Sequence, residues 1–533
     1  MRKLRVSLNR RALLCGGAGL IAATTLGRGA LAQVAAPAIV TADKARPQMP
    51  LGVQSGDILD DRAMVWSKTD RPARLIVEWS TTESFRDARR VVGPAALDVS
   101  DFTARIDLTE LPPGEQIFYR AMFQDLGDLK TLSVPLTGKF RTVPSGRRDV
   151  LFAYSGDEAG QGWGINPGWG GMKLYESMRK LQPDFFIHQG DQIYADGVIN
   201  AEYKLDDGSV WRNLTTEAKS HVAQSLADYR GAFAYNLLDE HKRRFCTEVP
   251  MVVQWDDHET RNNWYPGQII GAKNYDKVTS ASLLSAWARR AMFDYNAMRT
   301  NADDPERIYR SFAYGPSLEV FMLDERSYRG PNSPNRQSVL NDDAAFLGSA
   351  QLRWLKAALL RSRATWKVIA SDMPISIVVP DLNPDVPPGT FEAWANAENG
   401  APSGRELELA DLFGFIKTNR IRNLVWITAD VHYASVTRYD PSRAQFTEFD
   451  PFWEIVSGPI NAGTFGPGEI DQTFGPDVKW VSIPADMKQN RPPSDGRQFF
   501  ATGKIDGKTD LLTMTIYDLD GKKLHTLDIE PTA

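Results

Sequence analysis

Cysteine is scarce in this chain of 533 residues, which contains only Cys15 and Cys246. If the basic N-terminal segment is removed, Cys246 alone remains and no internal disulfide can form. The fold must then be stabilised by packing and by any metal that it binds. The chain also lacks a Gly-x-Ser-x-Gly elbow, and Cys246 has no partner motif, so a serine or cysteine hydrolase is disfavoured.

An excess of positive charge is also missing. The chain has 62 Lys and Arg against 67 Asp and Glu, and six of the basic residues lie in the first 32 positions, where no acidic residue occurs. Removing those six charges takes the formal charge from −5 to −11. This balance argues against nucleic-acid binding through bulk charge.

The first 32 residues have the layout of a twin-arginine signal peptide. The paired arginines are Arg10 and Arg11, an apolar run follows from Leu13, and Ala30-Leu31-Ala32 fits a small-residue cleavage site before Gln33. The apolar run is too short to span a bilayer. We therefore expect the twin-arginine machinery to deliver the protein to the periplasm or the medium, with no transmembrane segment in the mature chain.

After the first 32 residues, the pattern of apolar runs and turn residues divides the chain into two parts after a short linker. Residues 33–48 read as a linker, and residues 49–143 contain short β-type runs separated by turn residues, as in an immunoglobulin-like or fibronectin-like β-sandwich. From 149 to 533, apolar runs of strand length alternate with segments of helical period. That alternation predicts a layered α/β domain after a small all-β domain.

Acidic residues follow four of the apolar runs in the second part directly. The four strand-end segments are Ser155-Gly156-Asp157-Glu158, Gly190-Asp191-Gln192-Ile193-Tyr194, Asp256-Asp257-His258-Glu259 and Ala429-Asp430-Val431-His432. Loops at the carboxyl ends of strands in α/β sheets converge on one crevice, so the four segments are expected to meet. One such Asp alone is usually a cap or turn residue, but acids gathered from four loops would repel one another without cations.

In this order, the motifs resemble the PhoD-like alkaline phosphatases of the calcineurin-like metallophosphoesterase superfamily. The most specific stretch runs from Gln254 to Trp264, and Leu323 to Arg329 and Gly404-Arg405-Glu406-Leu407 are also similar. The resemblance implies a four-layer metallophosphoesterase-type β-sandwich flanked by helices. It also implies a secreted, metal-dependent phosphoric ester hydrolase that acts on phosphomonoesters, phosphodiesters or both.

The resemblance further implies a set of metal ligands. Asp191 would bridge two metals, and Asp257 stands where the family usually has Asn. His258, beside Asp257, is expected to protonate the leaving group. The other implied ligands are Asp157, Tyr194, Asp430 and His432, and the residues expected to hold phosphate oxygens are Arg326, Arg261, Asn262 and Asn263.

Two departures from the family pattern bear on the metals. Family members often have Cys after the first strand, where this chain has Gly156-Asp157-Glu158, and the superfamily has His where this chain has Asp372. Asp372 is therefore a further candidate ligand. Two or more metals are implied, and the oxygen-rich set favours Fe(III) with Ca or Mn, with Zn also possible.

The same departures support an alternative, in which the chain is an exported binding or adhesion protein with a degenerate phosphatase domain. Stoichiometric bound metal would favour the enzyme, and its absence would favour the binder.

Among the other aromatic and imidazole side chains, His188 is expected in the core. Trp163, Trp169, Trp255 and Trp264 are left open between the core and the mouth of the pocket.

Overall fold

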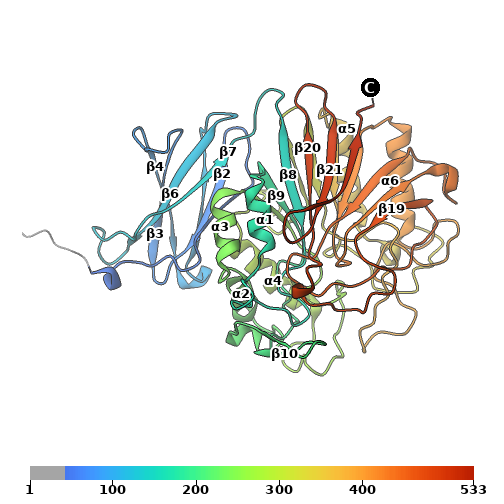
Figure 1. Ribbon diagram of the computed structural model, residues 1–533, viewed down its shortest axis with the longest axis horizontal. Coiled ribbons are helices and arrows are strands. Elements are labelled where there is room, and N and C mark those ends of the chain that lie inside the picture. Colours follow the sequence, from blue (N-terminus) through green and yellow to red (C-terminus); the bar gives the residue numbers. More distant parts are fainter. Residues whose placement is uncertain (1–41, 533) are drawn as a thin grey trace, which may run out of the picture. The chain divides into compact units, whose positions relative to one another are not determined.

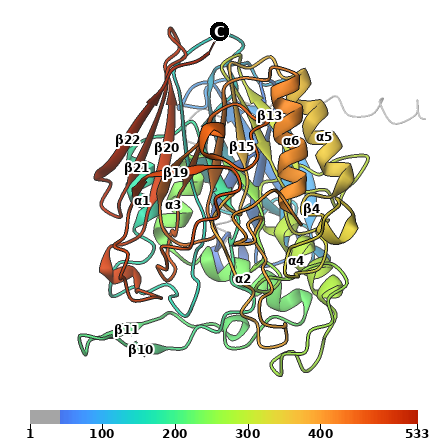
Figure 2. The ribbon, with the colours of Figure 1, turned by 90° about the vertical axis from the view of Figure 1, so that its right-hand side faces the viewer.

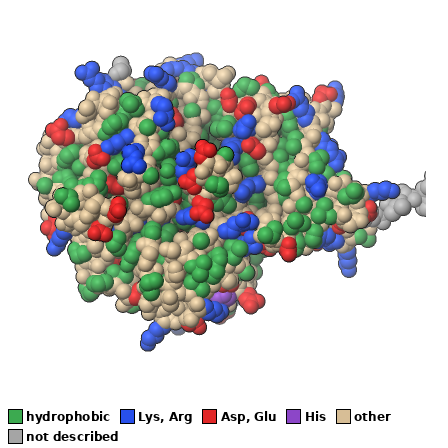
Figure 3. Space-filling view, turned by 180° about the vertical axis from the view of Figure 1, so that it is seen from behind, with side chains coloured by type: hydrophobic (Ala, Val, Ile, Leu, Met, Phe, Trp, Pro, Cys, Tyr) green, Lys and Arg blue, Asp and Glu red, His purple; other side chains and the backbone are tan. Residues whose placement is uncertain are grey.

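The computed structural model describes residues 42–532. The predicted signal peptide and most of the predicted linker therefore lie outside the described residues. Within residues 42–532, no helix combines the length and the apolar character that crossing a bilayer requires. On the face drawn in Figure 3, basic and acidic side chains are interspersed.

The first part of the described chain is all β, as the sequence predicts (Figure 1). One sheet has the strand order β4-β3-β6-β7, and a second layer contains β1, β2 and β5. Val65 of β2 and Leu75 and Val77 of β3 are buried in one core. The strands are β1 (Val53–Gly56), β2 (Ala63–Lys68), β3 (Ala73–Ser80), β4 (Arg89–Ala96), β5 (Thr103–Leu108), β6 (Gln116–Asp125) and β7 (Leu136–Arg141).

The second layer of this sandwich continues into the α/β part of the chain. Strand β1 pairs in parallel with β12 (Met251–Gln254), with Gly56 opposite Met251. One sheet of nine strands results, in the order β22-β21-β20-β8-β9-β12-β1-β2-β5. One sheet therefore runs through both parts of the chain.

Gly56 stands where two backbone segments approach β1. A Cβ atom at this position would lie 2.5 Å from the carbonyl oxygens of both Ala297 and Met251. We expect Gly56→Ala to lower the free energy of unfolding by about 1–3 kcal/mol, because neither backbone oxygen can move without disturbing the sheet. Gly146→Ala is the matched control, since its Cβ would meet no atom within 4 Å. Equal denaturation midpoints for the two variants would contradict this account.

Two large sheets form the α/β part. The nine-stranded sheet includes β8 (Val150–Ser155), β9 (Phe185–Gln189), β20 (Phe500–Ile505), β21 (Leu512–Tyr517) and β22 (Lys523–Ile529). The other sheet has the order β13-β14-β15-β16-β18-β17-β19. Its strands are β13 (Arg310–Tyr314), β14 (Leu318–Met322), β15 (Trp366–Ala370), β16 (Leu424–Thr428), β17 (Ser435–Tyr439), β18 (Phe452–Val456) and β19 (Pro476–Val481).

Alternation of side chains along each strand assigns one face to the other sheet and one face to helices. Phe152, Ile187 and Val368 are buried in the core between the two sheets. Their neighbours Ala153 and Phe186 are buried in a second core instead, and Ile369 in a third. Both faces of these strands are therefore covered, which explains why they appear in the sequence as continuous apolar runs.

Helices cover the outer face of each sheet (Figures 1 and 2). The core outside the nine-stranded sheet includes side chains of α1, α2, α3 and α4, and the core outside the seven-stranded sheet includes those of α5 and α6. The predicted α/β fold with four layers is confirmed. The helices are α1 (Leu174–Lys180), α2 (Leu226–Asn236), α3 (Glu240–Glu248), α4 (Ala281–Tyr295), α5 (Gly348–Arg361) and α6 (Glu406–Thr418).

The strands that precede the acidic segments are parallel to their neighbours. Strands β8, β9 and β12 are parallel in one sheet, and β14, β15, β16 and β18 are parallel in the other. Their carboxyl ends therefore lie along one edge of each sheet. The loops that leave those edges carry the residues singled out from the sequence.

Candidate metal centre

The acidic loops meet, as the strand-end pattern predicts. Asp157 follows β8, Asp191 follows β9, and Asp257 follows β12, each within three residues of the strand's end. Asp430 and His432 follow β16. Among residues 42–532, three groups of side chains bring their ligand atoms within 4.8 Å of one another: Asp157, Asp191 and His432; Asp191, Asp257 and His258; and Asp256, Asp257 and Asp430.

Asp191 belongs to the first two of these groups, so its carboxylate could contribute to both. Asp257 is likewise shared between the second and third groups. Asp256 is a member that the sequence analysis did not select. Its signal was present, because Asp256 directly precedes Asp257 in the stretch that best resembles the family.

Four of the grouped residues have left-handed backbone conformations. The φ angles are 65° at Asp157, 51° at Asp191, 60° at Asp430 and 61° at His432. Such conformations cost roughly 1–3 kcal/mol each when the residue is not glycine, and they persist where the surrounding structure holds them. In this protein, these four residues all belong to the groups in which the candidate ligand atoms converge.

The donor set fits cations. Both carboxylate oxygens of Asp157 are buried without a hydrogen-bond partner, and so are Oδ2 of Asp256 and Oδ1 of Asp257. Burial, followed by the charge of Asp256, raises the pKa of Asp191 well above its usual range, and burial does the same to Asp157. Unpaired buried carboxylates are costly, and a bound cation removes that cost.

His432 is prepared to act as a ligand through Nε2. Its Nδ1 lies 2.5 Å from the carbonyl oxygen of Gly463, which can only accept, so Nδ1 carries the proton. Burial lowers the pKa of His432 to about 4, so the ring is neutral. Nε2 lies 2.7 Å from the Tyr194 hydroxyl and 3.7 Å from Oδ1 of Asp157. The Tyr194 oxygen therefore lies beside the imidazole ligand atom of the first group.

His258 lies between Asp257, which belongs to the ligand groups, and Asp196, which does not. Its Nδ1 is 2.7 Å from Oδ1 of Asp196, and its Nε2 is 3.9 Å from Oδ1 of Asp257. The ring packs on Tyr194, with centroids 4.2 Å apart. Burial alone would lower the pKa of His258, but Asp196 and Asp257 raise it to about 10, so the ring can donate a proton.

Asp196 and Glu259 are further residues that the sequence analysis did not select. Asp196 also accepts from the backbone N–H of Asn262 at 2.7 Å. Glu259 accepts from the backbone N–H groups of Asp191, Gln192 and Asp256 at 3.2, 2.7 and 2.9 Å. It thereby ties the loop after β9 to the loop after β12. Neither role has a signal in one sequence, because both depend on which loops become neighbours.

Arg326 and Asp372 lie behind the ligand groups. Arg326 is completely buried, donates to Asp256 at 2.7 Å and to Glu392 at 2.6 Å, and lies 3.4 Å from Asp372. Asp372 is not a member of the three groups found among the described residues. Arg326 therefore contacts Asp256 and orients the Asp256 carboxylate through a hydrogen bond.

The three residues expected to bind phosphate after Asp257 contact a neighbouring loop. Asn263 Nδ2 donates to Asp381 at 3.1 Å, and Asn262 accepts through its carbonyl oxygen from Asn383 at 3.0 Å. Arg261 is buried, 3.5 Å from Asp385, with its guanidinium over the Tyr275 ring. Asn262 and Asn263 also line a pocket that is lined by five of the grouped residues, Asp191, Asp257, His258, Asp430 and His432, whereas Arg261 does not.

This pocket has a volume of about 720 Å³. Asp191, Asp257, His258, Asp430 and His432 form its polar side. The four tryptophans left open by the sequence are not among its lining residues, and Trp255 and Trp264 are buried against each other. His188 is completely buried on β9, as expected.

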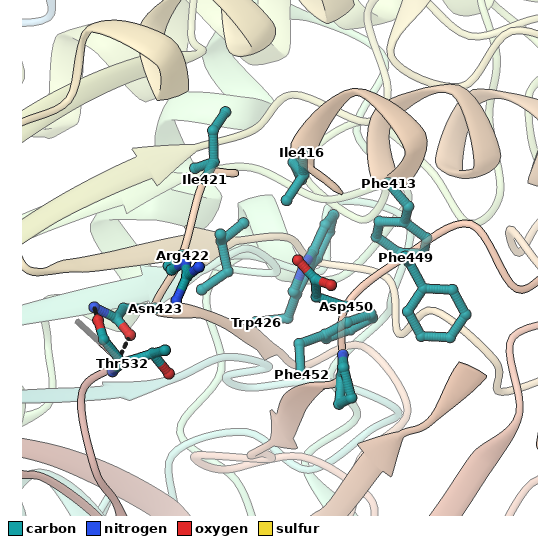
Figure 4. A pocket seen from close by; sticks show the side chains of 12 residues that line it. Phe413, Ile416, Ile421, Arg422, Asn423, Trp426, Phe449, Asp450, Phe452 and Thr532 are labelled. Carbon is teal, nitrogen blue, oxygen red and sulfur yellow. Dashed lines mark hydrogen bonds between the residues drawn. The ribbon is translucent and has the colours of Figure 1, made fainter. Parts of the chain in front are cut away.

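A second cavity, of about 340 Å³, lies where β16 and β18 begin, opposite to the ends that carry the ligands (Figure 4). It is lined mainly by aromatic and aliphatic side chains such as Phe413, Trp426 and Phe452, together with Asp450. No His and none of the grouped acids line it. The pocket at the carboxyl ends of the strands is therefore the candidate site.

Comparisons with known proteins agree with this geometry. The chain matches the family model of the PhoD-like phosphatases over residues 152–515 and that of the PhoD-like phosphatase N-terminal domain over residues 33–144. It is 28% identical over 478 residues to alkaline phosphatase D of Bacillus subtilis (strain 168). The aligned region covers 84% of this chain and 76% of that protein.

Two solved structures have a similar fold. A structure of PhoD matches with a TM-score of 0.66 and 21% identity over 92% of this chain and 93% of that one. A purple acid phosphatase, PPD1 from yellow lupin (Lupinus luteus) seeds, matches with a TM-score of 0.53 and 13% identity over 91% of this chain and 74% of that one. With the family model covering more than half of the sequence, and with buried ligand groups at the strand ends, this chain belongs to the PhoD-like phosphatase family, whose members are metal-dependent phosphoesterases.

Proposed function

We propose that this protein is an exported alkaline phosphatase that hydrolyses phosphomonoesters, phosphodiesters or both by direct attack of water. The observation that carries the proposal is the pair of ligand groups joined by Asp191 on the polar side of the pocket. Cations held there would supply Lewis acidity toward the phosphate and a lowered pKa for the attacking water. We propose Fe(III) with Ca or Mn, since the donors are mostly oxygen and include the phenol of Tyr194.

The residues of the chain have separate tasks in this reaction. Asp157, Asp191 and His432, with Tyr194 beside His432, would hold one cation, and Asp191 and Asp257 would hold the other. Asp430 groups with Asp256 and Asp257 next to this second position, and Arg326 orients Asp256. Water gives up one proton to the solvent as its oxygen forms a bond to phosphorus, and the ester P–O bond breaks with its electron pair on the departing oxygen. His258 then donates its Nε2 proton to that oxygen, while Asp196 holds the ring through Nδ1.

Hydrolysis of two chromogenic esters tests the proposal. Protein supplied with Fe and with Ca or Mn is expected to release 4-nitrophenol from 4-nitrophenyl phosphate, from bis(4-nitrophenyl) phosphate, or from both at alkaline pH. Removal of metal by a chelator should stop the release, and readdition should restore it. The alternative of a degenerate domain, which the departures at Asp157 and Asp372 motivate, predicts no bound metal and no hydrolysis.

Export is proposed from the N-terminal motif alone, which lies outside the described residues. Replacing Arg10 and Arg11 together by Lys is expected to leave the full-length protein inside the cell, because the export machinery reads the paired arginines. Cell fractionation with immunoblotting measures the distribution. Unchanged delivery of a shortened, mature protein to the periplasm or medium would rule out this route.

A further inference from the structure

The pocket has a second, apolar side that the reaction with phosphate does not use. Six side chains form what we call the apolar wall: Ile377, Val378, Val379, Leu382, Phe391 and Phe465. Leu382 is 81% exposed, although its neighbours on the wall are buried or half-buried. A single exposed leucine is ordinary, but one that continues an apolar surface into a catalytic pocket gains burial only when something occupies that pocket.

The wall is held in shape by backbone hydrogen bonds between segments far apart in sequence. The N–H of Val378 donates to the carbonyl of Glu469 at 2.9 Å, and the N–H of Glu392 donates to the carbonyl of Val379 at 3.0 Å. Pro380 and Phe391 are also opposite each other in an isolated antiparallel bridge. The segments around 378, 391 and 469 therefore support one another, so the wall is formed before a ligand arrives.

The wall is also fixed relative to the ligand groups. Asp381 accepts from Asn263 at 3.1 Å, and Asn383 donates to the carbonyl of Asn262 at 3.0 Å. These contacts lie on either side of Leu382 and join its loop to the segment that follows Asp257. This gives a structural task to Asn262 and Asn263, and it keeps the apolar wall at a set position from the reacting phosphate.

Size and charge indicate what the wall contacts. A volume of about 720 Å³ falls within the roughly 300–1,000 Å³ of pockets that bind drug-sized ligands, well beyond the needs of phosphate alone. No Lys or Arg is among the described residues that line it, and the acids outside the ligand groups are Glu392 and Glu469. A second anionic group on the substrate would therefore find no cationic side chain along this wall, whereas an uncharged apolar group would find a complementary surface.

We propose that the apolar wall binds an apolar substituent of the phosphate ester, an alkyl or aryl group, so that the preferred substrates are phosphate esters of apolar alcohols. This proposal rests on the proposed phosphatase function and specifies the substrate class of the same site. The phosphate lies against the ligand groups, and the substituent extends over Val379, Leu382 and Phe391.

A series of 4-nitrophenyl alkyl phosphates with methyl, butyl and hexyl groups tests the proposal in the metal-loaded, full-length protein. We expect kcat/KM to rise with chain length, by up to about fourfold for each added methylene that becomes buried. In Leu382→Ser the rise per methylene should fall by at least about half. Leu129→Ser, which changes a leucine 63% exposed in the N-terminal part, is the matched control and should keep the full rise.

The outcomes separate the wall from the proposed function. If the methyl ester is cleaved but kcat/KM does not depend on chain length, or if Leu382→Ser behaves as Leu129→Ser does, the wall has no such role while the phosphatase stands. If 4-nitrophenyl phosphate is cleaved but none of the alkyl esters is, the role of the wall fails while the phosphatase stands. If neither 4-nitrophenyl phosphate nor any alkyl ester is cleaved, the proposed function fails and the role of the wall fails with it. Phosphatidylglycerol vesicles, offered beside the soluble hexyl ester, identify the source of the apolar group. Cleavage of both supports a lipid chain on the wall, and cleavage of the hexyl ester alone supports soluble esters.

Discussion

Asp191→Asn is expected to lower kcat/KM for either nitrophenyl ester by at least about 10³-fold, because Asp191 is shared by two ligand groups and its loss weakens both cation sites. Metal analysis should show reduced metal content in the same variant. The substitution keeps the size of the side chain and an oxygen able to accept from the backbone N–H of His258, which lies 3.1 Å from Oδ1 of Asp191. The loss is therefore expected without unfolding.

The stability of the metal-free protein provides an independent readout. The Asp191 carboxyl is buried among other acids, so its replacement by a neutral amide should leave the thermal midpoint of the metal-free protein unchanged or higher. Asp450→Asn, which changes an acid that lines the second cavity, is the matched control and should retain activity and metal. Full metal content together with activity within about tenfold of the unsubstituted protein would reject the bridging role of Asp191.

His258→Asn is expected to slow alkyl phosphate esters far more than nitrophenyl esters. An alkoxide is a poor leaving group without a proton, and a positioned acid contributes about 10²–10⁴-fold. Nitrophenolate departs without that proton, so its release should fall much less. The comparison therefore separates proton donation from an effect on the cations, which would slow both kinds of ester alike.

The pH dependence follows from the same residue. Burial lowers the pKa of His258, but Asp196 and Asp257 outweigh burial and raise this pKa to about 10. The imidazolium proton is therefore present at neutral pH and is lost as the pH rises through the pKa. Bound cations would lower the value, because their charge opposes protonation nearby. We expect the alkyl ester rate of the unsubstituted protein to fall on the alkaline side, and this limb should be absent in His258→Asn. His221→Asn, which changes a partly exposed histidine paired with Asp228, serves as the control. Equal losses for both classes of ester would assign His258 a structural task instead.

Much of the candidate centre could be predicted because its signals are local. Each of Asp157, Asp191, Asp257 and Asp430 comes directly after an apolar run, and parallel strands bring such ends together whatever the details of packing. Strands covered on both faces also leave a clear mark in the sequence, since both sets of alternating side chains must be apolar. The α/β layers and the four ligand loops follow from these two patterns.

Roles that depend on which loops become neighbours could not be predicted in the same way. Arg326 was expected at the phosphate, yet its guanidinium is buried against Asp256 and Glu392. Asn262 and Asn263 were expected to bind phosphate, and they also hold the loop that carries Leu382. A guanidinium or amide bonds equally well to phosphate, carboxylate or backbone, so residue type alone does not choose among them.

The sequence by itself determined the order of strands and acids along the chain, because apolar runs and the residues that end them are properties of adjacent positions. The tertiary structure alone decided that β1 joins β12, that Glu259 links two ligand loops, and that the apolar wall and His258 line the same pocket. Each of these contacts joins positions far apart in the chain. Such contacts arise only when packing makes distant segments neighbours, and one sequence contains no local pattern that specifies them.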